Sequence, residues 1–162
     1  MTVPAIEELD RLAPEAFAEA VAPLFEGAAR FLARLTEARP FGRHEALFAR
    51  ARQIARTMPE EEQLELIDAH PRLGAAQASV SALSHTEQGY DRGVADLAEE
   101  LRRLNAAYEA RFGFRYCVFV AGRSRAALLP EFETALGADR DAEVARALEA
   151  VVDIAHDRWG RR

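Results

Sequence analysis

The sequence predicts an all-α protein: a single-domain multi-helix bundle of about seven to nine helices, with no significant sheet, over residues 1–162. Three observations predict this fold class. Apolar residues recur at spacings of three and four along most of the chain, as on one face of a helix. Prolines and glycines fall between these segments, where helices begin and end. The length of 162 residues suits one domain, and no linker, repeat or low-complexity tract divides the chain.

In the first 70 residues, apolar stripes predict successive helices separated by prolines. Pro14 suits a first turn, Pro23 marks a break, and Pro40 stops a helix. Residues 57–60 (TMPE) predict a capping box that opens a helix, which must end near residues 69–70 because a proline follows. The stripes consist of Phe17, Val21 and Leu24; Phe31, Leu32 and Leu35; Leu47, Phe48, Ala51 and Ile54; and Leu64 and Ile67.

After the small and polar residues 74–83, which predict a loop, Ser84-x-x-Glu87 predicts a second capping box. The stripe that follows ends at Phe112, with Gly113 as the C-cap. Residues 114–121 are apolar and β-prone, and this short, isolated run favours a buried extended segment or a short helix. The stripe consists of Val94, Leu97, Leu101, Leu104 and Tyr108.

Two more helices complete the predicted bundle. Ser124 can cap the first of them, which Gly137 closes, and the second begins at about Asp141. Their stripes consist of Leu128, Leu129, Phe132 and Leu136, and of Val144, Leu148, Val151, Ile154, Ala155 and Trp159.

The composition narrows the class of protein. A net charge of −6 disfavours general nucleic-acid binding but permits an anionic small molecule, because one or two buried arginines can dominate a pocket. The single cysteine, Cys117, excludes an intrachain disulfide and is expected in the core. No Cys/His cluster has the spacing of metal ligands. Without a secretory signal or a membrane-length apolar stretch, we expect a cytoplasmic protein that binds no membrane.

His70 is the sharpest candidate for chemistry. It lies at a helix end before Pro71, and an imidazole titrates near neutrality, which suits a general acid or base. The alternative is a histidine favoured at a helix C-terminus by the helix dipole. Ser84 and Glu87 are fully explained as a capping box, although the N-terminus of a capped helix can also bind an anion. His85 stands beside this cap and could line the same site.

Arg158 projects among apolar residues of the last helix, near the centre of its stripe. An arginine there either meets an anionic partner, such as a ligand carboxylate, or extends to solvent near the helix end. Both alternatives stay open from the sequence. His44, His156 and the pair Arg102-Arg103 are expected to face solvent. Residues 116–120 are more typical of core, although their backbone groups could contact a ligand.

Together these motifs resemble the 2-oxo-4-hydroxy-4-carboxy-5-ureidoimidazoline (OHCU) decarboxylase family of the urate-to-allantoin pathway. The resemblance covers nearly the whole chain. It rests on Phe25-Glu26-Gly27, Arg39-Pro40-Phe41, Ala69-His70-Pro71-x-Leu73-Gly74, Ser84-x-x-Glu87-Gln88, Leu104-Asn105-x-x-Tyr108-x-x-Arg111-Phe112-Gly113-Phe114, Glu143-x-x-x-Ala147-Leu148 and Ile154-x-x-x-Arg158.

The resemblance implies an all-helical, cofactor-free enzyme, usually a homodimer, that decarboxylates a small anionic ureidoimidazoline to (S)-allantoin. It implies that His70 is the catalytic acid/base, that Glu87 hydrogen-bonds to the substrate and that Arg158 holds the substrate carboxylate or a ring oxygen. Residues 116–120 would contribute mainly backbone contacts. The implied substrate-binding residues are Pro71, Ser84, His85, Thr86, Glu87, Gln88, Tyr116, Cys117, Val118, Phe119, Val120 and Arg158.

The chain departs from the family pattern at four places. Arg72 stands where many members have Asp, which adds a cation beside the histidine. Arg115 stands where proline is common, so the backbone there is expected to be less constrained. The usual Ala-Gly-Leu appears as Arg92-Gly93-Val94, and the stretch between residues 88 and 112 is a few residues shorter than is common.

Two other functions stay open from the sequence. One is a non-catalytic helical module that binds a partner or a purine-like ligand. Convergence of His70, Glu87 and Arg158 on one cavity would argue against it. The other is an enzyme acting on a different ureido or imidazoline acid, which parallel turnover assays would separate from OHCU decarboxylation.

Overall fold

The computed structural model describes residues 2–75 and 97–161, which contain helices and no strand. The eight α-helices of these residues agree with the predicted all-α class and helix number. The elements are α1 (Ile6–Leu9), α2 (Pro14–Val21), the 3-10 helix η1 (Ala22–Phe25), α3 (Ala29–Glu37), α4 (His44–Thr57), α5 (Glu60–Asp68), α7 (Ala98–Phe112), α8 (Arg125–Leu136) and α9 (Arg140–Gly160).

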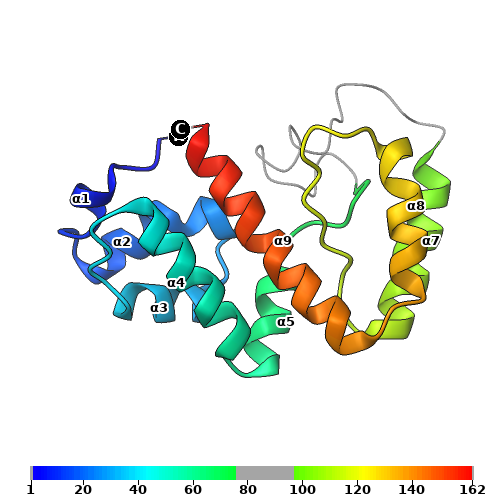
Figure 1. The fold of residues 1–162 in the computed structure, drawn as a ribbon, viewed down its shortest axis with the longest axis horizontal. Helices are drawn as coiled ribbons and strands as arrows, with labels where there is room; N and C mark the ends of the chain where they lie inside the picture. Colours follow the sequence, from blue (N-terminus) through cyan, green and yellow to red (C-terminus); the bar gives the residue numbers. More distant parts are fainter. Residues whose placement is uncertain (1, 76–96, 162) are drawn as a thin grey trace.

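α9 is the helix around which the others are arranged. Its 21 residues give it a length of about 32 Å. α4, α5 and η1 pack against it. Figure 1 shows α1–α4 on one side of α9 and the pair α7–α8 near its N-terminal end, so that the molecule is elongated.

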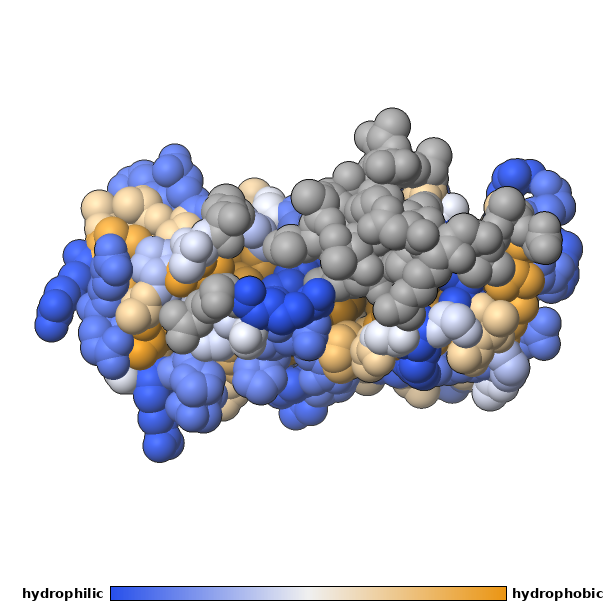
Figure 2. All heavy atoms as spheres, turned by 90° about the horizontal axis from the view of Figure 1, so that it is seen from above, coloured by the Kyte–Doolittle hydropathy of each residue, from blue (hydrophilic) through white to orange (hydrophobic). Residues whose placement is uncertain are grey.

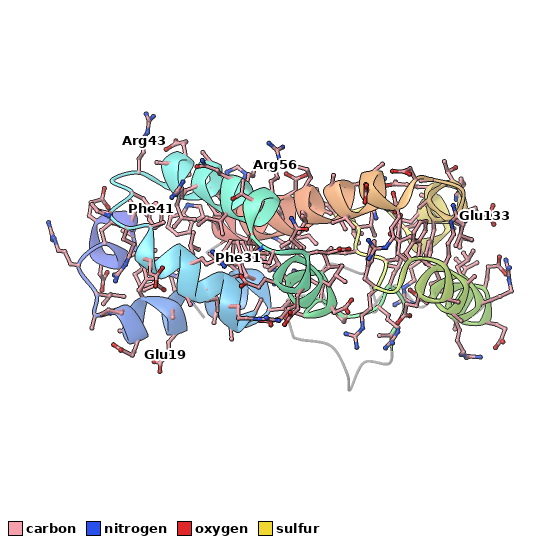
Figure 3. All side chains as sticks on the ribbon, turned by 90° about the horizontal axis from the view of Figure 1, so that it is seen from below. Glu19, Phe31, Phe41, Arg43, Arg56 and Glu133 are labelled. Carbon is pink, nitrogen blue, oxygen red and sulfur yellow. The ribbon has the colours of Figure 1, made fainter. Side chains whose placement is uncertain are left out.

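The core follows the predicted stripes. Phe17, Phe31, Leu47 and Val151 are among the side chains that are at most 1% exposed. Figure 3 shows Phe31 in the interior between helices, whereas Arg43 projects outward. The positions that repeat at helical spacing are therefore the ones that remove apolar area from water.

In the N-terminal half, prolines set the helix boundaries, but one predicted cap is wrong. Pro14 is the first residue of α2, and Pro23 lies in η1, where the α-helical geometry ends. The capping box predicted at residues 57–60 does not form. Pro59 occupies the N-cap position of α5, and the Thr57 hydroxyl donates to the Gln53 carbonyl at 2.8 Å. Thr57 still belongs to α4, so its hydroxyl bonds to its own helix.

In the described part of the C-terminal half, the caps predicted at Gly113 and Ser124 are present. Gly113 ends α7 in the left-handed conformation with φ 82°, and the Ser124 hydroxyl accepts the N–H of Ala127 at 3.1 Å. α9 begins at Arg140, slightly before the predicted start, because Asp139 is its N-cap and accepts the N–H of Ala142. Residues 115–120 are neither helix nor strand and are mostly buried, as the extended alternative predicts.

A buried polar network joins α7 to α9. The Tyr108 hydroxyl donates to Glu143 Oε1 at 2.7 Å, and Arg146 donates to both Glu143 oxygens. Burial, and then the Glu143 hydrogen bond, raise the pKa of the Tyr108 phenol. The ring of Tyr116 stacks on Phe132 with centroids 3.9 Å apart, yet its hydroxyl is buried without a hydrogen-bond partner among the described residues.

Charged side chains cover the surface of the described helices. Arg52 of α4 pairs with Glu149 and Asp153 of α9 at 2.5 and 2.6 Å. Arg102 and Arg103 are exposed, as expected. Figure 2 shows hydrophilic side chains at both ends of the elongated body. None of the helices in residues 2–75 and 97–161 combines the length and apolarity that crossing a bilayer requires.

The two buried tyrosines give a matched test of this core. Tyr108→Phe removes the hydrogen bond to the buried Glu143 carboxylate. It should lower the free energy of unfolding by about 1.5–3 kcal/mol, the usual contribution of a hydrogen bond to a charged group. Tyr116→Phe removes a hydroxyl that has no hydrogen-bond partner in residues 2–75 and 97–161 and should be neutral or stabilising. Urea denaturation at pH 7 measures both, and equal losses in the two variants would contradict the network.

Candidate functional site

His70 follows the C-terminal end of α5 and turns its ring into the protein. Its backbone N–H donates to the Ile67 carbonyl at 3.1 Å, and its Nδ1 atom lies 3.0 Å from the Leu66 carbonyl oxygen. Because a carbonyl oxygen only accepts, Nδ1 carries the proton of the neutral ring and Nε2 keeps its lone pair. The residue is 3% exposed. This burial argues against a surface histidine attracted by the helix dipole.

The Nε2 atom of His70 is buried and has no hydrogen-bond partner among the described residues. Burial is the largest cause that lowers the pKa of His70, to about 4, and the positive charge of Arg158 acts in the same direction. The charge of Glu26 opposes this shift. The imidazole is therefore neutral at pH 7. A buried, unsatisfied lone pair destabilises a fold and is typical of a functional position.

Arg158 is buried on α9 and does not extend to solvent. Its side chain is 1% exposed. Nη2 donates to Glu26 Oε1 at 2.7 Å, and Nη1 donates to the Pro23 carbonyl, also at 2.7 Å. A buried ion pair therefore connects the C-terminal end of α9 to the residue that follows η1. The structure excludes the solvent-facing alternative for Arg158.

Glu26 is a site residue to which the sequence analysis assigns no role. It adopts a left-handed conformation with φ 51°, which is uncommon for a residue with a side chain and can store strain. Its side chain is 12% exposed. The signal that could have indicated it is Arg158 itself, because a buried guanidinium requires an anionic partner.

The residues after His70 dock on α7. Asn105 donates its side-chain N–H to the Leu73 carbonyl at 2.9 Å. Gly74 has φ +79°, and a Cβ atom there would lie 2.8 Å from Leu101 Cδ1. The backbone conformation therefore favours glycine, and any other residue would also force the Leu101 side chain to shift. Pro71 is half-buried next to His70.

Two of the arginines that depart from the family pattern, Arg72 and Arg115, make specific contacts. Arg72 donates to both carboxylate oxygens of Glu109 on α7, at 2.8 and 2.7 Å. The expectation that Arg115 leaves the backbone less constrained is wrong. Its backbone N–H donates to Asp68 Oδ1 at 2.8 Å, and its guanidinium donates to the carbonyls of Asp68 and His70. Proline has no N–H with which to form the first bond.

In the predicted binding segment, residues 116–120, arginines occupy several carbonyl oxygens. The carbonyls of Cys117, Phe119 and Val120 accept from the guanidinium groups of Arg146 and Arg123. Among the described residues, no backbone carbonyl accepts from the N–H groups of the segment's last three residues. The segment can thus offer N–H donors to an anion.

Five predicted binding residues lie outside the described residues, and their roles stay predictions: Ser84, His85, Thr86, Glu87 and Gln88. The second predicted capping box and residues 92–94 also lie outside. Of the three residues His70, Glu87 and Arg158, the structure brings His70 and Arg158 close enough that the charge of Arg158 lowers the pKa of His70.

The other two histidines of the described residues contact aromatic side chains. His156 is exposed, as expected, whereas His44 is half-buried and stacks on Trp159 with centroids 6.0 Å apart. Within residues 2–75 and 97–161, no three His, Cys, Asp or Glu side chains form a group that could hold a metal ion.

The fold and the site define an all-α protein with a neutral imidazole, a guanidinium and a carboxylate buried where α5, α9 and η1 meet. Such a set suits acid/base chemistry on a small anionic molecule. The chain belongs to the OHCU decarboxylase family, whose match covers residues 10–160.

Relatives agree with this membership. The chain is 28% identical to the OHCU decarboxylase of Haloferax volcanii, over 97% of this chain and 95% of that protein. It is 26% identical to a uric acid degradation bifunctional protein of Bacillus sp. strain TB-90, over 93% of this chain but only 30% of the relative's length. The crystal structure of an OHCU decarboxylase in the presence of (S)-allantoin shares the fold, with a TM-score of 0.72 at 20% identity over 86% of this chain and 94% of that one.

The depressed pKa of His70 predicts a pH dependence of stability. The unfolded chain protonates this histidine near pH 6.5 and the folded protein near pH 4. In this interval the unfolded state binds more protons, so the free energy of unfolding falls as the pH is lowered. The wild type should lose about 3 kcal/mol more than His70→Asn between pH 7 and pH 4. Urea denaturation across this range measures the difference, and parallel profiles would refute a buried neutral imidazole.

Proposed function

We propose that this chain decarboxylates OHCU to (S)-allantoin in urate breakdown, with His70 as the acid/base. The observation that carries the proposal is the neutral, buried imidazole, whose Nε2 has no partner among the described residues and lies within electrostatic reach of a buried arginine. Membership of the OHCU decarboxylase family over residues 10–160 supports it.

The reaction requires no external electron sink. OHCU carries a carboxylate and a hydroxyl on one ring carbon, next to a C=N carbon. When the bond to the carboxylate breaks, CO2 leaves and its electron pair forms a C=C bond, while the C=N pair moves to nitrogen, which takes up a proton. The hydroxyl then loses its proton to become a carbonyl, and the neighbouring carbon gains one. Because the substrate itself accepts the electrons, the proposed mechanism uses no cofactor.

The neutral, Nδ1-protonated form of His70 suits it to move a proton between two substrate atoms. The Nε2 lone pair accepts the hydroxyl proton, and the imidazolium then delivers a proton to the ring carbon on one face. Because burial disfavours the charged imidazolium, the proton is readily returned. Delivery from a fixed position gives one enantiomer.

Other residues are proposed to orient the substrate. Arg158 holds its carboxylate or a ring oxygen, since a guanidinium binds planar anions through paired N–H groups. Glu87 hydrogen-bonds to the hydroxyl or the ureido group, and the N–H groups of residues 116–120 bind charge that develops on the ring. We propose a cytoplasmic homodimer as the working form, from the family resemblance. Sedimentation would test it against twice the 17.9 kDa chain mass.

A chiral assay tests the function. OHCU generated freshly from urate also decays spontaneously to racemic allantoin, so the circular dichroism signal of (S)-allantoin distinguishes catalysis from decay. His70→Asn should lower kcat by about 10²–10⁴, the usual contribution of a positioned acid/base, while far-ultraviolet circular dichroism stays unchanged. His156→Asn, at an exposed position, serves as the control and should keep the wild-type rate.

Two results would reject parts of this proposal. Racemic product at the uncatalysed rate with the wild type would remove the decarboxylase assignment. A near-normal rate in His70→Asn would reject this residue as the acid/base.

Arg158→Lys tests the anion contact. Lysine keeps the positive charge near Glu26 but cannot maintain the planar, multi-donor contacts of the guanidinium. We expect KM to rise about tenfold, the equivalent of 1.4 kcal/mol, with a smaller change in kcat. Steady-state kinetics by the chiral assay measures both, and an unchanged KM would place the substrate anion elsewhere.

A further inference from the structure

The turn that carries His70, residues 68–70, lies at the C-terminal end of α5, where the last helical carbonyls have no partner within the helix. Arg115 supplies partners there. Its Nη1 atom donates to the Asp68 carbonyl at 2.8 Å and to the His70 carbonyl at 3.3 Å. A guanidinium is also favoured at this end of a helix by the helix dipole.

The same residue connects this turn to the segment that follows α7. The backbone N–H of Arg115 donates to Asp68 Oδ1 at 2.8 Å. Arg115 thus forms three hydrogen bonds with a turn more than 40 positions away in the sequence, and it directly precedes residues 116–120. Its contacts fix the backbone of His70 relative to that segment.

Few hydrogen bonds hold the buried ring of His70 in place. Its Nδ1 atom meets the Leu66 carbonyl, and its Nε2 atom meets no partner among the described residues. The backbone position of His70, together with the packing around its ring, therefore helps to set where Nε2 points. A misplacement of about 1 Å in a reacting group can lower a rate about 100-fold.

We propose that Arg115 is a positioning residue for the decarboxylation, which acts through His70 by holding its carbonyl and that of Asp68. This inference rests on the proposed function. Arg115 touches neither the substrate nor the reacting proton. It sets the distance between the imidazole and the substrate bound along residues 116–120, and so sets the rate of proton transfer and the face that receives the proton.

The variants separate the guanidinium from the rest of the residue. Arg115→Met keeps the backbone N–H and most of the stem but cannot donate to the two carbonyls. Arg115→Lys can restore these bonds, because a single nitrogen of Arg115 makes both and an ammonium group has three donors. Arg102→Ala, at an exposed arginine of α7 paired with Glu99, is the control.

In the chiral assay we expect Arg115→Met to lower kcat about 10- to 100-fold with KM within about twofold, and to lower the enantiomeric excess of the product. Arg115→Lys should return kcat to within about threefold of the wild type. Arg102→Ala should match the wild type. Wild-type kcat in Arg115→Met, a change in KM alone, or equal losses in the Met and Lys variants would overturn the proposal.

A second measurement does not depend on activity. The ring carbon–proton signal of His70 in the ligand-free protein, identified by its loss in His70→Asn, should shift or broaden in Arg115→Met and stay in place in Arg115→Lys and Arg102→Ala. An unchanged signal in Arg115→Met would overturn the proposal. Racemic product from the wild type would instead reject the decarboxylase function, and the nuclear magnetic resonance result would still decide the positioning role.

Discussion

The buried ion pair between Arg158 and Glu26 is the interaction on which the site depends. It connects α9 to η1 and places a positive charge within electrostatic reach of His70. Buried charges lose their hydration, and well-packed apolar residues often replace such pairs at no loss of stability. Removing one partner, by contrast, leaves the other charge buried without an opposite charge beside it. The pair is therefore better understood as a device that fixes a guanidinium beside an imidazole than as a source of stability.

This placement explains the resting state of His70. Burial and the nearby arginine both disfavour the protonated ring, and the Leu66 carbonyl selects the tautomer whose Nε2 lone pair is free to accept a proton. With its pKa lowered to about 4, His70 is deprotonated at pH 7, so in the proposed mechanism it would be a weak base that is fully available. An arriving anion would offset the charge of Arg158 and favour the imidazolium, so that substrate binding itself would strengthen the base.

Arginine side chains hold segments of irregular backbone in this protein by hydrogen bonds to carbonyl groups. The sequence contains no lysine. The carbonyls of Pro23, His70, Cys117 and Phe119 each accept from a guanidinium. Segments outside helices need partners for their backbone groups, and a planar group with five donors can satisfy several carbonyls at once. In the segment 116–120 the bonds occupy the carbonyls of Cys117, Phe119 and Val120, whereas no backbone carbonyl of the described residues accepts from the N–H groups of residues 118–120. Donors of this kind are what an anionic ligand requires.

Periodicity, prolines and glycines in the sequence were sufficient to predict the all-α fold, most helix ends and the position of Arg158 on the apolar face of its helix, because these depend on interactions within a few residues. His70 and Arg158 could be singled out from local sequence too. His70 is a titratable residue at a helix end before a proline, and Arg158 is a charged residue on an apolar helix face. The contacts of Glu26, Asp68 and Arg115 could not be predicted, since their partners lie tens of residues away and only packing brings them together. Local sequence thus determined the helices and the candidate imidazole, whereas the tertiary structure decided its charge state and its orientation, because both depend on burial and on charges contributed by distant segments.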